Sequence, residues 1–190
     1  PGGGFPGGFK PSMTLSSKKL TFTMGGDPVT LTASVKMPTL PGADEGDGET
    51  ETYTYTWTSL DPTVATVSTD GTVTPVGTGT CKIKCICVTD SGKITAKCTV
   101  KVKPIVPTSV TLDSSSITLA VGETHQLTAT VAPEDATNKS VSWSSKKKKI
   151  AKVSQTGLVT AVKVGTTKIV CKTKSGSLKA VCTVTVVADA

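Results

Sequence analysis

The stretch TYTWTS at residues 54–59 determines the interpretation of this sequence, because the chain repeats it as SVSWSS at residues 140–145. The offset of 86 then continues without a gap for nearly thirty residues and aligns Gly71 with Gly157. Upstream the offset grows to 96, so the first copy contains about ten extra residues within 38–51. An internal repeat of this length predicts two related domains, 11–103 and 104–190, preceded by a flexible Gly/Pro-rich linker at 1–10.

Both copies alternate apolar and polar residues in short runs separated by turn residues. Residues 126–131 place Leu127, Ala129 and Val131 on one face, as expected for a single strand. About seven such runs occur in each copy, which is the strand count of an immunoglobulin-like sandwich. We therefore predict an all-β protein made of two tandem immunoglobulin-like β-sandwiches, with Trp57 and Trp143 as the core tryptophans between the sheets.

Composition restricts the function classes. The 190 residues carry a formal net charge of +7, and every basic residue is a lysine. Arginine, the usual reader of phosphate and guanine, is absent, and aromatic residues make up only 4% of the chain, so we expect no nucleic-acid partner. The longest apolar runs are far shorter than a membrane span, which predicts no membrane insertion. The start at Pro1, without an initiator Met or a leader, predicts a fragment or a processed chain.

The second copy carries a family resemblance over residues 108–187. It reads VTL at 110–112, VGET at 121–124, QLTATVAP at 126–133, VSWSS at 141–145 and GLVTAV at 157–162. This pattern resembles the bacterial immunoglobulin-like domain family, group 2, which occurs in intimin- and invasin-type adhesins, other surface proteins and phage virion proteins. The first copy resembles it more loosely, because it has Gly25-Gly26-Asp27-Pro28 where the second has Gly122-Glu123-Thr124.

The resemblance implies a seven-stranded sandwich used in tandem, with no shared catalytic residues and no cofactor. We expect a non-enzymatic spacer of an exported bacterial protein, located outside the cell or at its surface, that contributes to display, adhesion or assembly. Its partners would be other protein domains, a host or cell-surface receptor, or an anionic polysaccharide. One alternative is a phage virion decoration protein on the particle surface. Another is a carbohydrate-binding accessory module of a secreted hydrolase, for which only Tyr53 and Tyr55 remain as spare aromatic residues.

Six cysteines fall in the last two strands of the copies. The strand that would hold the antibody-type partner has none, so that bridge is excluded. A Gly176-Ser177 turn would place Cys171 opposite Cys182, whereas a Ser175-Gly176 turn would offset them by two residues. In the first copy, a Ser91-Gly92 turn would oppose Cys85 and Cys98, and a Gly92-Lys93 turn would bring Cys87 there instead. The plainer interpretation is buried thiols, and these disulfides are the alternative. Spacing and the single histidine argue against a metal site.

Two charged segments distinguish the copies. Lys146, Lys147, Lys148 and Lys149, followed by Lys152, occupy the turn after the tryptophan strand, where the first copy has Leu60-Asp61-Pro62-Thr63. This turn is either a solvated turn or an electrostatic patch for an anionic partner. The insertion at 38–51 holds five carboxylates, but their spacing matches no calcium loop, and a solvated loop is the preferred interpretation.

Overall fold

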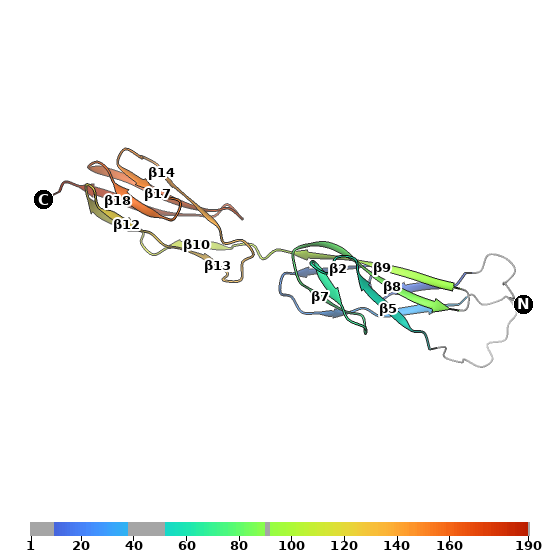
Figure 1. The fold of residues 1–190 in the computed structure, drawn as a ribbon. Helices are drawn as coiled ribbons and strands as arrows, with labels where there is room; N and C mark the ends of the chain where they lie inside the picture. Colours follow the sequence, from blue (N-terminus) through green and yellow to red (C-terminus); the bar gives the residue numbers. More distant parts are fainter. Residues whose placement is uncertain (1–9, 38–51, 90–91, 190) are drawn as a thin grey trace, which may run out of the picture. The chain divides into compact units, whose positions relative to one another are not determined.

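The computed structural model describes residues 10–37, 52–89 and 92–189, which form two compact units, Pro1–Lys103 and Pro104–Ala190. The acidic insertion expected at 38–51 and residues 1–9 of the expected linker lie outside the described residues. No described residue is helical, and both units are built from antiparallel and parallel strands (Figure 1). None of the described residues forms a helix long and apolar enough to span a bilayer.

Domain 1 contains nine strand segments among its described residues. Its four-stranded sheet has the order β2-β9-β8-β5, its three-stranded sheet has the order β3-β7-β6, and β1 pairs with β4. The segments are β1 (Ser12–Leu15), β2 (Lys19–Thr23), β3 (Val29–Thr30), β4 (Ala33–Lys36), β5 (Tyr55–Ser59), β6 (Ala65–Val67), β7 (Thr72–Pro75), β8 (Gly79–Thr89) and β9 (Gly92–Lys103).

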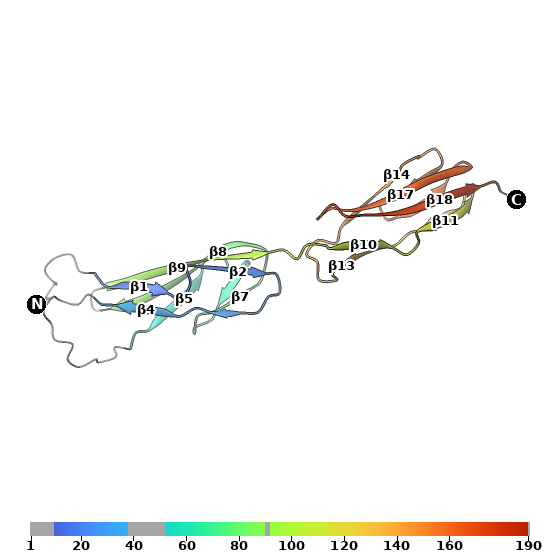
Figure 2. The ribbon, with the colours of Figure 1, turned by 180° about the vertical axis from the view of Figure 1, so that it is seen from behind.

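Domain 2 repeats this plan. Its sheets have the orders β11-β18-β17-β14 and β12-β16-β15, and β10 pairs with β13, as can be followed in Figure 2. The segments are β10 (Ser109–Leu112), β11 (Ser116–Ala120), β12 (Thr124–Gln126), β13 (Ala129–Ala132), β14 (Val141–Ser145), β15 (Ala151–Val153), β16 (Leu158–Ala161), β17 (Gly165–Thr173) and β18 (Lys179–Val187).

The nine segments of domain 2 correspond to seven strands, two of which are interrupted. β10 and β11 are two halves of the first strand, and β12 and β13 are two halves of the second. The uninterrupted strand expected over residues 126–131 is therefore wrong: Leu127 and Thr128 break it, and the two halves pair with different strands. The inward face is nevertheless the predicted one, because Leu127 and Val131 are buried.

In each domain the first strand also runs parallel to the last. β2 pairs with β9 from Lys19↔Thr99 to Thr23↔Lys103, and β11 pairs with β18 over five residues in the same sense. The last strand of each domain and the second half of its first strand are thus hydrogen-bonded side by side and point in the same direction, whereas the first half, β1 or β10, pairs with β4 or β13.

Each tryptophan packs against the core of its own domain. Trp57 contacts the cluster that includes Phe22 and Val100, and Trp143 contacts both apolar clusters of domain 2. A glycine lies under each ring: Gly157 has φ +90°, and a Cβ there would lie 2.9 Å from Trp143 Cζ2 and 2.5 Å from the Leu127 carbonyl oxygen. Gly71 has the same role beneath Trp57, with φ +87°. Both copies therefore contain a glycine beneath the tryptophan ring, at a position whose positive φ and close contacts exclude any residue with a Cβ atom.

Candidate functional site

The backbone of the lysine-rich turn in domain 2 is held without help from any lysine side chain. Lys146 N–H donates to the Lys168 carbonyl at 2.9 Å, which ends the β14–β17 pairing. Lys147 N–H donates to the Thr167 hydroxyl at 3.0 Å, and its own carbonyl accepts from Ile150 N–H at 2.9 Å. Thr167 is buried, so its hydroxyl is a fixed acceptor. The four lysine side chains consequently play no part in the hydrogen bonding that closes this turn.

The structure adds a sixth cation to the five that the sequence indicated. Val162 N–H and Lys163 N–H both donate to the Ile150 carbonyl, which brings the loop after β16 against the lysine turn. All six lysines are exposed, and within the described part of the chain no acidic side chain is ion-paired with any of them. The lysine cluster, as we define it, consists of Lys146, Lys147, Lys148, Lys149, Lys152 and Lys163.

Sequence reasoning missed Lys163 because it lies fourteen positions after Lys149 in the chain. The signal that could have found it is the short hairpin of β15 and β16. Antiparallel pairing of Ala151 with Ala161 returns the chain to the turn, so the residues after β16 must lie beside it.

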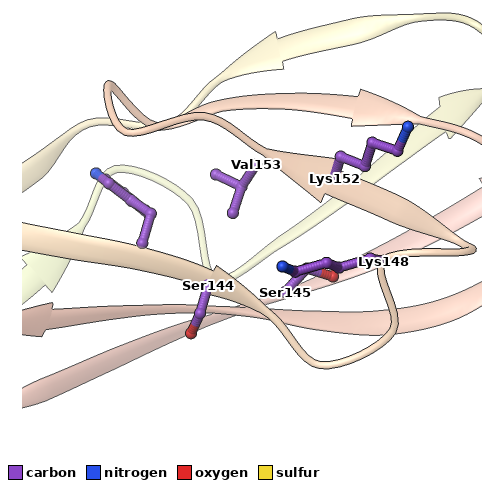
Figure 3. A pocket seen from close by; sticks show the side chains of 6 residues that line it. Ser144, Ser145, Lys148, Lys152 and Val153 are labelled. Atoms are coloured by element: carbon purple, nitrogen blue, oxygen red, sulfur yellow. The ribbon is translucent and has the colours of Figure 1, made fainter.

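Two hollows adjoin the lysine cluster and share Lys148. The larger, of about 480 Å³, is lined by lysines and by two apolar side chains, Ile150 and Val164. The smaller, of about 260 Å³, is lined by Trp143, Ser144, Ser145, Lys148, Lys152 and Val153. In Figure 3, Lys148 reaches from the turn toward Ser145, while Lys152 and Val153 come from the neighbouring strand. Exposed cationic groups thus surround partly apolar surfaces.

The corresponding turn of domain 1 keeps the backbone pattern and changes the chemistry. Leu60 N–H donates to the Lys82 carbonyl at 2.9 Å, as Lys146 does to Lys168. Here, however, the Asp61 carboxylate closes the turn by accepting from Thr63 N–H at 3.1 Å and from the Thr63 hydroxyl at 2.6 Å. Cys81 stands where domain 2 has Thr167. Asp61 N–H donates to the Ser59 hydroxyl at 3.3 Å, where the equivalent Lys147 N–H donates to Thr167, so both copies use a hydroxyl for this bond and domain 1 adds a carboxylate.

The cysteines are all buried free thiols, and the proposed bridges are not formed. In domain 2, Cys171 lies opposite Ala180 and Cys182 lies opposite Ile169, so the two cysteines are offset by two residues, which is the register expected for a Ser175-Gly176 turn. The turn that gives this register includes two residues with positive φ, Gly176 and Ser177.

In domain 1 neither register considered from the sequence occurs. Thr89 pairs with Gly92, so Cys85 lies opposite Ala96, Cys87 opposite Ile94, and Cys98 opposite Ile83. The disulfide alternative for Cys85 with Cys98 and for Cys171 with Cys182 is corrected accordingly: none of these pairs is directly opposed across the hairpins.

Burial makes these thiols poor nucleophiles. It raises the pKa of Cys85 to about 11, with a smaller contribution from the neighbouring Cys87, and it raises the pKa of the other five. Because the thiolate is the reactive species, the shifts make the cysteines unreactive near neutral pH. Their side chains serve as small apolar core residues, and no group of three potential metal ligands occurs among the described residues.

The two tyrosines considered as a binding surface for a sugar are neither fully buried in the core nor fully exposed on the surface. Tyr53 and Tyr55 are half-buried in the strand region that leads to Trp57. Burial raises the pKa of Tyr55, and the nearby Cys87 and Cys85 thiols raise it further. The two rings are therefore only partly available to a ligand.

Two sandwiches with this strand order, each with a tryptophan between its sheets, define the chain as a tandem of immunoglobulin-like domains. Residues 106–184 match the model of the bacterial Ig-like domain (group 2), and residues 53–104 match that of the bacterial Ig-like domain. The chain belongs to the bacterial immunoglobulin-like domain family, with the two copies in tandem, as the sequence resemblance predicted.

Curated relatives share short segments with the chain. An uncharacterised protein of Clostridium acetobutylicum is 43% identical over 60 residues, which is 32% of this chain and 6% of that protein. An alpha-L-arabinofuranosidase of Bifidobacterium longum subsp. longum is 42% identical over 62 residues, which is 30% of this chain and 6% of the enzyme. The chain thus spans only a small fraction of the length of the relatives that it matches.

Solved structures of similar architecture include the S-layer protein rSbsC(31-844), at 26% identity with a TM-score of 0.45, covering 95% of this chain and 28% of that one. Drosophila N-cadherin EC1-4 is 11% identical, with a TM-score of 0.42, covering 95% of this chain and 49% of that one.

Proposed function

We propose that the chain is a non-enzymatic spacer of an exported bacterial surface protein that holds other parts of that protein away from the cell and withstands tension between its ends. Membership of the bacterial immunoglobulin-like family supports a structural or adhesion-type module. The observation that carries the proposal is the parallel pairing of the first and last strands in both domains.

That pairing determines how a pulling force acts on a domain. The C-terminal end of a domain leaves from the last strand. Its N-terminal end leads through β1 or β10 into β2 or β11, which is parallel to the last strand, so tension slides these two strands along each other. All hydrogen bonds of the ladder are then loaded together instead of being opened one at a time. In domain 2 the ladder extends from Thr183 N–H donating to the Ser115 carbonyl to Val121 N–H donating to the Val187 carbonyl. Domain 1 has the equivalent bonds from Thr99 N–H to Lys18 and from Met24 N–H to Lys103.

Force spectroscopy on the full chain, pulled from its termini, tests the proposal. We expect two discrete unfolding events, each releasing on the order of 300 Å of chain at about 3.5 Å per residue. Val121→Pro removes a ladder hydrogen bond between β11 and β18 and should lower the unfolding force of domain 2. Lys146→Pro removes one bond between β14 and β17, at the opposite edge of the same sheet, and is the matched control.

Equal loss of force in both variants would contradict the spacer mechanism, as would unfolding without a discrete event. The location is tested separately by exposing intact cells of the parent organism to a protease that does not cross membranes. Cleavage of the tandem supports surface display. Its recovery only on phage particles would favour the virion alternative instead.

The arabinofuranosidase relative supports one second candidate, an accessory module of a secreted glycan hydrolase. On this alternative the tandem would bind a neutral plant polysaccharide through Tyr53 and Tyr55. Retention of the chain on insoluble arabinoxylan, lost on Tyr55→Ala, would favour the accessory role. Absence of retention would leave the spacer as the function.

A further inference from the structure

We propose that the lysine cluster of domain 2 and its two hollows bind an acidic polysaccharide, meaning a polymer of sugar rings that carry carboxylate groups. The inference deepens the proposed function by naming a partner of the surface module. It is carried by four features of the site: its uncompensated charge, its apolar floor, its dispensability for the fold and its absence from domain 1.

The positive charge of the lysine cluster determines the sign of the charge on its partner. Six ammonium groups lie on two adjacent loops and on strand β15, which carries Lys152, and among the described residues none of the six is ion-paired with a carboxylate. Several like charges without counter-charges produce a positive local potential, which attracts a polyanion and repels cations. The partner must therefore carry several negative charges.

The hollows favour a sugar polymer over an acidic peptide. The larger hollow exposes Ile150 and Val164 among the lysines, and Val164 is 55% exposed. The smaller is lined by Trp143 and Val153 and by Ser145, whose hydroxyl donates to the Ala151 carbonyl at 2.6 Å. A sugar ring has an apolar C–H face that packs on such apolar side chains, whereas a run of acidic peptide residues needs only the charges.

Lysine chemistry also suits carboxylates spaced along a polymer. Each ammonium group is a point charge with three rotatable donors, so it accommodates single acidic groups at variable positions. Arginine, which grips one carboxylate in a fixed bidentate geometry, is absent from the chain.

The fold does not require these lysines. Domain 1 forms the same turn with Leu60-Asp61-Pro62-Thr63, and it has Thr66 and Gly77 where domain 2 has Lys152 and Lys163. The six lysines contribute nothing to closing the turn, and their charges repel one another. Binding of an anionic ligand would explain why they are present.

Equilibrium binding of the full chain to polygalacturonate, a carboxylated sugar polymer, tests the inference. The triple variant Lys148→Gln, Lys149→Gln, Lys163→Gln should weaken binding at least tenfold and reduce its salt dependence. The matched control changes the same number of charges at the far end of β17 and β18, as Lys172→Gln, Lys174→Gln, Lys179→Gln, and should weaken binding less than twofold.

Two further arms separate a sugar site from a plain charge effect. Val164→Ser leaves the charge unchanged and should weaken binding to polygalacturonate severalfold while leaving binding to poly-L-glutamate unchanged. Uncharged dextran should not bind. Equal weakening by the two lysine triples, or equal affinity for polygalacturonate and poly-L-glutamate, would overturn the inference. Either result would leave the force and display experiments unaffected, so the two proposals fail separately.

Discussion

The two copies form the same turn after the tryptophan strand from opposite kinds of side chain. In domain 1, Asp61 accepts two hydrogen bonds and thereby closes the turn, whereas in domain 2 the buried Thr167 hydroxyl accepts the backbone N–H of Lys147. The two acceptors serve different N–H groups, because Lys147 N–H of domain 2 corresponds to Asp61 N–H of domain 1, which donates to the Ser59 hydroxyl at 3.3 Å. Domain 2 therefore closes the turn without any side chain from residues 146–149, so the turn does not constrain these four surface positions, and all four are lysine.

The feature that the copies share most strictly should give the largest effect when it is broken. Gly157→Ala forces a Cβ against the Leu127 carbonyl and the Trp143 ring at φ +90°, so domain 2 should lose about 3 kcal/mol or more of unfolding free energy. Gly122→Ala is the matched control, since Gly122 has the same φ of +90° and open space around it, and should cost about 1 kcal/mol.

Denaturant unfolding measures both variants domain by domain, because each domain has one tryptophan. In a Trp57→Phe background, Trp143 fluorescence reports domain 2 alone. Equal costs for Gly157→Ala and Gly122→Ala would mean that backbone strain, not the approach of the ring, requires glycine under the tryptophan.

The next difference between the domains should be their loss of folding stability at alkaline pH. The six thiols have raised pKa values in the folded state, so the stability that they contribute is fully present below the unfolded thiol pKa and is lost as the pH rises through the folded pKa values, about 11 for Cys85. Domain 1 holds four of these thiols and domain 2 holds two, so domain 1 should lose more stability over this range.

Unfolding measured from pH 8 to pH 11 checks the alkaline loss, and Cys85→Ala provides the test of cause. That variant should reduce the alkaline loss of domain 1 and leave the loss of domain 2 unchanged. An unchanged pH dependence in domain 1 would show that other groups are responsible.

The turns themselves should give an intermediate effect. Asp61→Ala removes the acceptor of Thr63 N–H and should destabilise domain 1 by about 1 kcal/mol, and Thr167→Val should destabilise domain 2 by a similar amount, because Lys147 N–H loses its partner. Lys147→Ala, at the position equivalent to Asp61, should change stability by only a few tenths of a kcal/mol. A cost for Lys147→Ala as large as that for Asp61→Ala would give the lysine side chain a structural role.

Much of the fold could be predicted from the sequence, because alternation and repetition can be recognised directly in the order of the residues. The tandem of sandwiches and the inward face of Leu127 and Val131 followed from the period of two and the offset of 86. Where strands switch partner was not predictable in this way: the break at Leu127 and Thr128 arises because each half of the strand pairs with a different sheet.

The hairpin registers depended on turn geometry that dipeptides do not specify. A turn containing Gly176 and Ser177, both at positive φ, determines which residues face Cys171 and Cys182. At the candidate site, the run of lysines and the adjacent Ile150 were evident in the sequence, but Lys163 and Val164 join them only through pairing of β15 with β16.

The last prediction, with the smallest change in stability, concerns whether the lysine cluster destabilises domain 2. Lys148→Gln with Lys149→Gln should stabilise domain 2 by a few tenths of a kcal/mol at low salt, because the neighbouring ammonium groups no longer repel one another. The gain should disappear at about 1 M salt, where the Debye length falls to about 3 Å. Pro62→Gln, at the position equivalent to Lys148, is the control for polar substitution at this turn and should show no salt-dependent gain.

Unfolding curves at two ionic strengths measure this difference, read from Trp143 for the domain 2 variant and from Trp57 for the domain 1 control. A destabilisation at low salt would mean that the lysines support the fold after all, and their presence would need no ligand to explain it. A salt-dependent stabilisation would mean that domain 2 maintains an unfavourable concentration of charge that domain 1 does without. A surface that is costly to the fold and unnecessary for the turn is what a binding site for a polyanion requires, because the same repulsion that weakens the free domain is relieved when the polymer binds.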